Sequence, residues 1–297
     1  MKWKASQMPD QTGKVVIVTG SNTGIGFHIA QGLAAKGATV ILACRNLKKA
    51  NSAKMRIVES FPNADLIIEL LDLASLSSIR DFSNNIFSRQ SRVDILINNA
   101  GVMIPPKTIT EDGFELQFGT NHLGHFALTA HLLPILEGES SRIVTVSSIA
   151  NNMGSIDFED LNGKRKRYDK WGMYCQSKLA NILFSLELGR RLKESGSKIR
   201  SLCSHPGYSA TELQRYSPFW KFLNFFIAIS AQRGAAPTLY AATESDALSY
   251  PYWGTTGLFE ARGWTGRASI NSKAMDLDDS ILLWKMSEDL TNVSFLS

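Results

Sequence analysis

Cysteine is scarce in this sequence, and the cysteines that are present follow no metal-binding pattern. Cys44, Cys175 and Cys203 are an odd number of residues without metal-like spacing in a chain of 297 residues. Such a set is typical of free thiols in a reducing compartment. We therefore expect a cytoplasmic protein with no metal site.

Long hydrophobic runs are also absent. The N-terminal residues 1–14 are polar and lack the apolar region of a secretory signal. The longest apolar stretch, residues 219–230, is interrupted by Lys221 and Asn224. It is shorter than the ~20 residues of a membrane-spanning helix. We therefore expect no transmembrane segment.

Charge of one sign is nowhere concentrated enough to indicate nucleic-acid binding. The net charge of +5 is modest and spread along the chain. The one dense basic run, residues 163–170, is typical of a solvated loop, with a localisation signal or an anion site as alternatives. We therefore predict no nucleic-acid partner.

Strand-like and helix-like segments alternate through the first two thirds of the chain. Strands are expected at residues 14–20, 38–44, 65–73, 93–101, 141–148 and 198–207, and helices at 24–37, 46–60, 76–90, 111–136 and 172–194. This order predicts right-handed βαβ crossovers and a parallel sheet with helices on both faces.

The alternation is lost after residue 207. A seventh strand is expected within residues 255–261, and a terminal helix over 275–295 with Ile281, Leu282, Trp284 and Leu290 facing inward. We thus predict one α/β domain over residues 1–297, with a Rossmann-type doubly wound sheet of about seven strands. Residues 14–207 would form the cofactor-binding and catalytic core, and 208–270 the substrate loop and an appendage.

A glycine-rich turn, TGSNTGIG, follows the first strand and begins the first helix. Its spacing is GxxxGxG, and the commoner GxGxxG is absent. Gly20 permits a tight turn, Gly24 lets the backbone approach a pyrophosphate, and Gly26 allows close helix–strand packing. The helix N-terminus offers N–H groups to an anion. The turn predicts a dinucleotide-binding site, and a glycine-rich turn without a ligand is the alternative. The other residues expected in this site are Ser21, Asn22, Thr23 and Ile25.

The second strand lacks the acidic residue that usually binds the ribose of NAD. Arg45 follows it instead. A guanidinium matches a 2′-phosphate that a carboxylate would repel, so we favour NADP(H) over NAD(H). A plain surface arginine is the alternative. Asp72, followed by Leu73 after the third strand, could accept a bond from the adenine amino group or could be a turn or N-cap aspartate.

Further motifs occur in a characteristic order along the chain. They are NNAG (98–101), Asn121, VSS (146–148), YCQSK (174–178) and HPG (205–207). Together with the glycine turn, this set resembles the short-chain dehydrogenase/reductase family over roughly residues 14–210. ACRN and YCQSKLANILF are most similar to its retinol dehydrogenase-like branch, and light-dependent protochlorophyllide reductase is a neighbouring branch.

Tyr174 and Lys178 are four residues apart and therefore share one face of a helix. Leu179, Ile182 and Leu183 have helical spacing on another face, toward the core. A phenol has an unperturbed pKa of about 10. We expect the charge of Lys178 to lower the pKa of Tyr174 toward working pH. The resemblance implies that Tyr174 is the acid/base and that Lys178 also binds the nicotinamide ribose.

The resemblance implies roles for two more polar residues. Ser148 would polarise the substrate oxygen, although Ser147 is a rival on the same strand. Asn121 would hold a water beside the lysine, unless its amide is satisfied by its own helix. Ser148 and Tyr174 are 26 residues apart, about twice the usual family gap. The retinol dehydrogenase-like branch carries a similar insertion.

Other cofactor contacts are implied near two strand ends. Members of the family lay the adenosine and its ribose beside the residues equivalent to Asn98, Ala100 and Gly101. The segment after the sixth strand would contact the carboxamide and phosphates through Pro206, Gly207 and Thr211. A lone histidine before such a turn, here His205, is more often structural.

The substrate end of the chain is aromatic. Residues 219–230 could be a substrate lid, an interfacial helix in weak contact with a membrane surface, or a dimer contact or core segment. A lid would suit a small hydrophobic carbonyl or alcohol. We therefore predict an NADP(H)-dependent oxidoreductase for a retinal-like substrate, lipid aldehyde or ketone. A protochlorophyllide reductase-like enzyme and a non-catalytic NADP sensor are the alternatives, and a homodimer is expected by analogy only.

Overall fold

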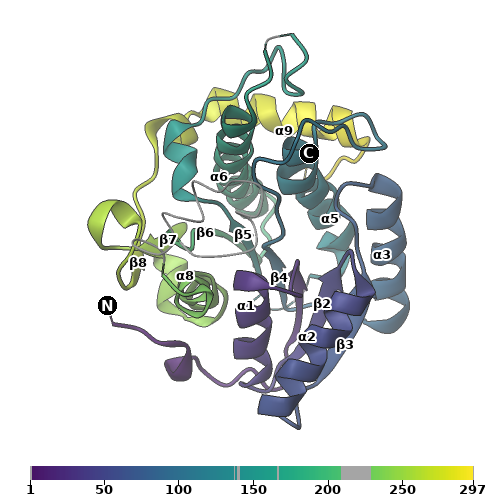
Figure 1. Cartoon of the computed structure of the whole chain (residues 1–297), viewed down its shortest axis with the longest axis vertical. Helices are drawn as coiled ribbons and strands as arrows, with labels where there is room; N and C mark the ends of the chain where they lie inside the picture. Colours follow the sequence, from purple (N-terminus) through teal and green to yellow (C-terminus); the bar gives the residue numbers. More distant parts are fainter. Residues whose placement is uncertain (1, 137, 139–140, 166, 209–228, 297) are drawn as a thin grey trace.

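The computed structural model describes residues 2–136, 138, 141–165, 167–208 and 229–296 (Figure 1). Its strands are β1 (Val15–Thr19), β2 (Thr39–Cys44), β3 (Leu66–Leu70), β4 (Ile95–Asn98), β5 (Arg142–Val146), β6 (Arg200–Ser204), β7 (Tyr252–Thr255) and β8 (Thr265–Arg267). Its principal helices are α1 (Gly24–Ala34), α2 (Leu47–Ser60), α3 (Leu76–Arg89), α4 (Leu116–Phe118), α5 (Gly124–Leu132), α6 (Lys170–Glu194), α8 (Ala231–Thr243) and α9 (Leu277–Thr291).

The strands form one sheet in the order β3-β2-β1-β4-β5-β6-β7-β8. All neighbours are parallel except β7 and β8. The order reverses between β1 and β4, which is where a doubly wound sheet opens a ligand crevice. The predicted α/β fold with a doubly wound sheet is therefore confirmed.

Helices cover both faces of this sheet (Figure 1). Side chains of α1, α2 and α8 pack into one apolar cluster against one face. Those of α3, α5 and α6 pack on the other, and α9 packs across α6. The strands between them read as nearly continuous apolar runs because both of their faces are buried.

The segment after β6 differs from its prediction. The described residues form eight strands instead of about seven, and α8 was not anticipated. The expected strand within 255–261 is wrong: β7 ends at Thr255, and Leu258–Glu260 form a 3₁₀ turn. Phe259 and Glu260 have φ of 48° and 56°, a left-handed conformation that ends any extended strand.

Two predicted helices also need correction. The helix expected over 111–136 begins only at Leu116 and contains a π-helical turn over Gly119–Leu123. In α9, Ile281 and Leu282 are 40% and 42% exposed, so their expected inward orientation is wrong. Trp284 is buried as predicted, Leu290 is half-buried, and Leu283 is buried instead. The helix is rotated so that Trp284 packs against aromatic rings of α5 and α6.

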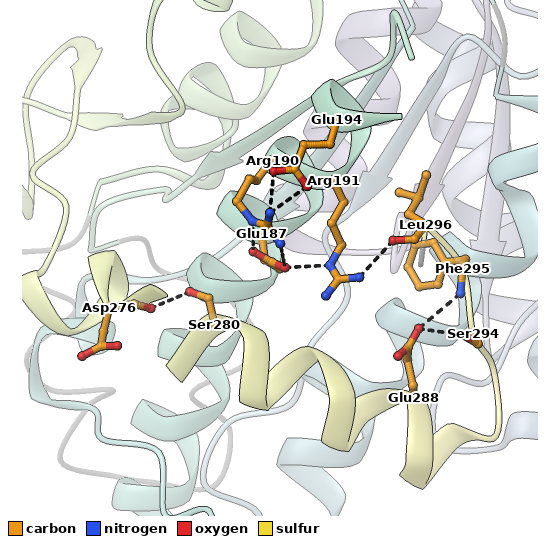
Figure 2. A network of polar contacts seen from close by, with 10 residues as sticks. All are labelled: Glu187, Arg190, Arg191, Glu194, Asp276, Ser280, Glu288, Ser294, Phe295 and Leu296. Atoms are coloured by element: carbon orange, nitrogen blue, oxygen red, sulfur yellow. Dashed lines mark hydrogen bonds and ion pairs between the residues drawn. The ribbon is translucent and has the colours of Figure 1, made fainter. Parts of the chain in front are cut away.

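A buried carboxylate joins α6 to the C-terminal residues (Figure 2). Glu187 is 2% exposed and accepts hydrogen bonds from Arg190 and Arg191 at 2.6 Å. Arg191 also donates to the carbonyl oxygen of Leu296 and lies over the ring of Trp284. Burial favours a raised pKa for Glu187, but the arginine hydrogen bonds outweigh it and lower the pKa. The carboxylate therefore stabilises the fold in its charged form.

We expect Glu187→Gln to lower the free energy of unfolding by about 2 kcal/mol at neutral pH, because charge-assisted hydrogen bonds are lost at a buried site. Because the pKa of Glu187 is lowered on folding, this stabilisation is present above its unfolded pKa and is lost as the pH falls through the folded value. Denaturant unfolding of wild type and Glu187→Gln at several pH values measures this difference in the free energy of unfolding. Glu194→Gln is the matched control, since Glu194 is largely exposed and also bonds Arg190. Equal losses in both variants would contradict the buried role.

Candidate active site

A cavity of about 420 Å³ lies where the parallel strands end. Its walls come from the turns that follow β1, β3, β4 and β6, from the ends of β2 and β5, and from the start of α6. Most of the predicted site residues line it: Gly20, Asn22, Thr23, Gly24, Ile25, Gly26, Arg45, Asp72, Leu73, Ala100, Gly101, Ser148, Tyr174, Lys178, Pro206 and Gly207. Residues far apart in the sequence are therefore brought to one crevice.

Of the predicted residues that the structure describes, three are not part of the cavity wall. Ser21 is buried with its hydroxyl 3.3 Å from the sulfur of Cys44. Asn98 donates to Thr129 from its amide, because the last residue of β4 points into the helix layer. Asn121 is buried behind the wall, and Thr211 lies outside the described residues. The side chains of Ser21, Asn98 and Asn121 are therefore not placed to contact a ligand in this cavity directly.

The glycine turn has the features of an anion site. Gly24 has a φ of 58°, a left-handed conformation that residues with a side chain rarely adopt. A Cβ on Gly26 would lie 2.4 Å from the carbonyl oxygen of Gly20, so only glycine lets α1 begin this close to β1. Thr23 makes no capping bond with its side chain. The N–H groups of the first turn thus remain available beside the cavity.

The end of β4 is held against β1 by an amide and a hydroxyl. Asn99 donates from its side chain to the carbonyl oxygen of Thr19 at 2.8 Å. The hydroxyl of Thr19 accepts from the backbone N–H groups of Asn99 and Ala100 at 2.9 Å. Asn99, and not the predicted Asn98, therefore lines the cavity.

Basic groups gather at the end of β2. Arg45 and Lys49 both line the cavity, and Asn46 between them caps α2 by accepting from the N–H of Lys49 at 2.9 Å. Asp72 also lines the cavity, and its carboxylate accepts from the N–H of Ala74. The turn role proposed for Asp72 is thus present, at a position that also faces the cavity. Lys49 was missed, although it is a second basic residue only four positions after Arg45 in the sequence.

Tyr174 and Lys178 lie on α6, whose N-terminus is capped by Asp169. Their side chains are 7% and 5% exposed. The ammonium of Lys178 donates to the carbonyl oxygen of Val146 at 3.2 Å and lies 5.9 Å from the centre of the Tyr174 ring. The helix therefore brings both groups to the cavity, as their spacing predicts.

The pKa values differ from the expectation. Burial raises the pKa of Tyr174 to about 12, and the hydrogen bond with Ser148 opposes this only in part. Burial also lowers the pKa of Lys178 to about 8. The expected lowering of the Tyr174 pKa by Lys178 is therefore wrong for this arrangement of side chains. Desolvation of the buried phenol is the largest cause of its raised pKa.

The two serines at the end of β5 have different partners. Ser147 donates its hydroxyl to the carbonyl oxygen of Lys178 at 2.7 Å, which is a helix-anchoring contact. The Ser148 hydroxyl accepts from the N–H of Ala150 and bonds the Tyr174 phenol. The hydroxyl beside the phenol is thus that of Ser148.

Asn121 lies within the π-helical turn between α4 and α5. Its amide group donates to the carbonyl oxygen of Val102 and to Ser177, and its oxygen accepts from the N–H of Val102. A Cβ on Gly101 would lie 3.1 Å from the Asn121 oxygen and 3.5 Å from the Lys178 ammonium. The amide is therefore satisfied by Val102 and by Ser177 of α6, and not by its own helix. A π turn inside a helix frequently marks a functional site.

Apolar side chains also line the cavity. Met103, Met153 and Trp171 are among its lining residues, Met103 packs in one cluster with Tyr174, and the Trp171 and Tyr174 rings are 5.8 Å apart. They come from three separate segments, so no local pattern in the sequence could group them. The predicted aromatic segment 219–230 cannot be compared, because residues 219–228 lie outside the described part of the chain.

Within the described ranges, no group of three or more His, Cys, Asp or Glu side chains could hold a metal ion. Among those same residues, no helix combines the length and apolar character needed to cross a bilayer.

Comparison with known proteins agrees with this geometry. A family model described as short chain dehydrogenase matches residues 14–221. Retinol dehydrogenase 13 of Mus musculus is 48% identical over 244 residues, covering 79% of this chain and 72% of the relative. Retinol dehydrogenase 12 of Homo sapiens is 39% identical over 288 residues, covering 95% and 87%.

A solved structure extends the likeness to the whole chain. The crystal structure of an uncharacterized protein from Mycobacterium Paratuberculosis is 41% identical, with a TM-score of 0.84 and 99% coverage of both chains. The chain belongs to the short-chain dehydrogenase/reductase family, is similar to its retinol dehydrogenases, and is an NAD(P)-dependent oxidoreductase acting on CH–OH or C=O groups.

Proposed function

We propose that the protein reduces the carbonyl group of a small hydrophobic substrate with NADPH, and oxidises the corresponding alcohol in reverse. The observation that carries this proposal is the meeting of Tyr174, Ser148 and Lys178 at one cavity with the glycine turn. NADPH would supply a hydride to the carbonyl carbon. The substrate oxygen then needs one proton to become an alcohol.

Tyr174 is the proposed source of that proton. A phenol with a pKa of about 12 is protonated at neutral pH, so it is ready to donate. Ser148 is placed to donate a hydrogen bond to the same oxygen as negative charge develops on it. Lys178 supplies positive charge nearby and is proposed to bind the nicotinamide ribose. Asn121 is proposed to hold a water next to Lys178 through which the phenolate regains its proton.

The preference for NADP(H) is proposed from the basic groups at the end of β2. Arg45 is exposed to solvent at the cavity wall, and Lys49 in the first turn of α2 lines the same wall. A guanidinium can form a bidentate hydrogen-bonded pair with a phosphate. No acidic residue stands between them in the sequence. These features favour a cofactor with a 2′-phosphate over one with a free 2′-hydroxyl.

The proposed substrate is an aldehyde, ketone or alcohol on a hydrophobic body. Met103, Met153 and Trp171 present an apolar wall beside the phenol, and such walls bind ligands with few polar groups. Retinal belongs in this class, and the curated relatives are named retinol dehydrogenases. Protochlorophyllide-like reduction stays an alternative. The homodimer, the weak contact with a membrane surface and the cytoplasmic location stay predictions.

A carbonyl panel tests the proposal. Retinal, medium-chain aldehydes and steroid ketones would each be mixed with the protein and NADPH or NADH, and the loss of nicotinamide absorbance followed. We expect turnover with at least one hydrophobic carbonyl and faster turnover with NADPH. Absence of turnover across the panel with either cofactor would contradict the proposal.

We expect kcat/KM for NADPH in carbonyl reduction to be constant between about pH 6 and about 8, and to fall roughly tenfold per pH unit above that. Lys178 is charged below its pKa of about 8 and neutral above it, whereas Tyr174 stays protonated throughout. A pH series of initial rates measures the profile. Lys178→Met, as the control, should show a low rate without this break. A wild-type profile that is level to pH 10 would contradict the role of Lys178.

A further inference from the structure

The segment that follows β6 is held by a buried histidine. His205 is fully buried, and its Nδ1 atom lies 3.1 Å from the backbone nitrogen of Gly207. Its Nε2 atom lies 3.1 Å from a carboxylate oxygen of Glu260. The N–H of Gly207 can only donate, so Nδ1 must accept. The proton of the neutral ring is therefore on Nε2, where it is donated to Glu260.

Glu260 is itself held in an unusual conformation. It and Phe259 both have left-handed backbone angles, although the Phe259 side chain is 89% exposed and gains little from packing. The Glu260 carboxylate accepts from the N–H of Ser269 at 2.7 Å, and its carbonyl oxygen accepts from the Thr255 hydroxyl. Left-handed residues outside glycine cost of order 1 kcal/mol or more and tend to cluster at functional sites.

The same turn contacts the wall of the cavity directly. The N–H of Tyr208 donates to the carbonyl oxygen of Ala261 at 2.7 Å. Gly207 has a φ of 68°, and a Cβ there would lie within 2.7 Å of Thr255 and Ala261 atoms. Pro206, Gly207 and Tyr208 all line the cavity. The turn over residues 257–261 therefore fixes the position of this part of the cavity wall.

We propose that Glu260 is a positioning residue for the cofactor, acting through His205 to hold Pro206, Gly207 and Tyr208 in their binding arrangement. This inference rests on the proposed function, in which that segment contacts the nicotinamide end of NADP(H). Removing the carboxylate leaves the His205 ring free to carry its proton on Nδ1. That proton would face the N–H of Gly207, and the bond holding the wall would be lost.

The electrostatics of the pair agree with this arrangement. Partial burial favours a raised pKa for Glu260, but hydrogen bonds from His205 and Ser269 outweigh it and lower the pKa. Glu260 is therefore a carboxylate at neutral pH and a good acceptor for Nε2–H. A glutamine at this position keeps one acceptor oxygen for Nε2–H and gives up the acceptor that faces the Ser269 N–H, so it is a conservative variant for the His205 bond.

Titration of the full-length protein with NADPH, followed by nucleotide fluorescence, tests the proposal. Glu260→Ala should weaken binding about tenfold, which is about 1.4 kcal/mol, and raise KM for NADPH while kcat at saturation changes by less than about twofold. Glu260→Gln should bind within about twofold of wild type. Unchanged binding in Glu260→Ala, or equal weakening in both variants, would overturn the proposal.

If the alanine variant fails to fold, the protonation state of the His205 ring nitrogens in wild type tests the proposal instead. Nitrogen-15 NMR of wild type, with the signal assigned through a His205→Asn variant, reports which ring nitrogen carries the proton. The proposal expects protonation at Nε2, and protonation at Nδ1 would overturn it. Failure of wild type to bind NADPH at all would instead refute the proposed function, so the two outcomes are distinguishable.

Discussion

Tyr174→Phe is expected to lower kcat for carbonyl reduction by at least about a thousandfold, while the affinity for NADPH stays within about twofold of wild type. Positioned proton donors contribute on the order of 10² to 10⁴ in rate. The substitution removes only the hydroxyl. The ring keeps its packing in the cluster with Met103, Ile104 and Ala150 and its contact with Trp171, so the cavity keeps its shape.

Steady-state rates and direct NADPH titration of the same preparation separate the two effects. Tyr168→Phe is the matched control, because Tyr168 bonds Glu115 and is not part of the cavity wall. It should retain wild-type turnover. If Tyr174→Phe lost cofactor affinity and turnover in equal measure, its effect would be on binding, and the proposed acid/base role would be wrong.

Arg45→Asp is expected to change the ratio of kcat/KM with NADPH to kcat/KM with NADH by at least about a hundredfold toward NADH. One charge-assisted contact to a phosphate is worth about 1.5–3 kcal/mol, and a carboxylate in its place also repels the phosphate. The same carboxylate could accept a hydrogen bond from a free 2′-hydroxyl. Arg45 is exposed, so the fold should tolerate the change.

Initial rates with each cofactor across a concentration series measure this ratio. Lys48→Asp makes the same change in charge three residues further on, at an exposed position that does not line the cavity. It should leave the ratio within about threefold of wild type. An unchanged ratio in Arg45→Asp would show that 2′-phosphate recognition lies elsewhere, with Lys49 the next candidate.

Several features of the active site were predictable because parallel strands all end at one edge of their sheet. Alternating strand and helix patterns identified β1 to β6, and each strand end carried a recognisable residue or motif. The four-residue step from Tyr174 to Lys178 placed both on one face of α6. These inferences need only local periodicity and the handedness of βαβ units.

Other features depend on contacts that no local pattern contains. The inward face of α9 is chosen by the packing of Trp284 against α5 and α6, so Ile281 and Leu282 face solvent despite their apolar character. Asn98 turns toward Thr129, and Asn99 takes its place at the cavity. The side-chain direction of a residue just past a strand end is decided by its neighbours in space.

The amino-acid sequence by itself determined the fold class, the family and most of the predicted residues that gather at the cavity, because periodicity and motif spacing act over a few residues. Only the tertiary structure decided the pKa values and the supporting contacts. Burial raises the pKa of Tyr174 to about 12 where spacing alone suggested a lowered value. Glu260 reaches His205 across 55 residues of chain because β7 pairs with β6. Desolvation and long-range hydrogen bonds depend on how the whole chain packs, and this packing cannot be read from the sequence.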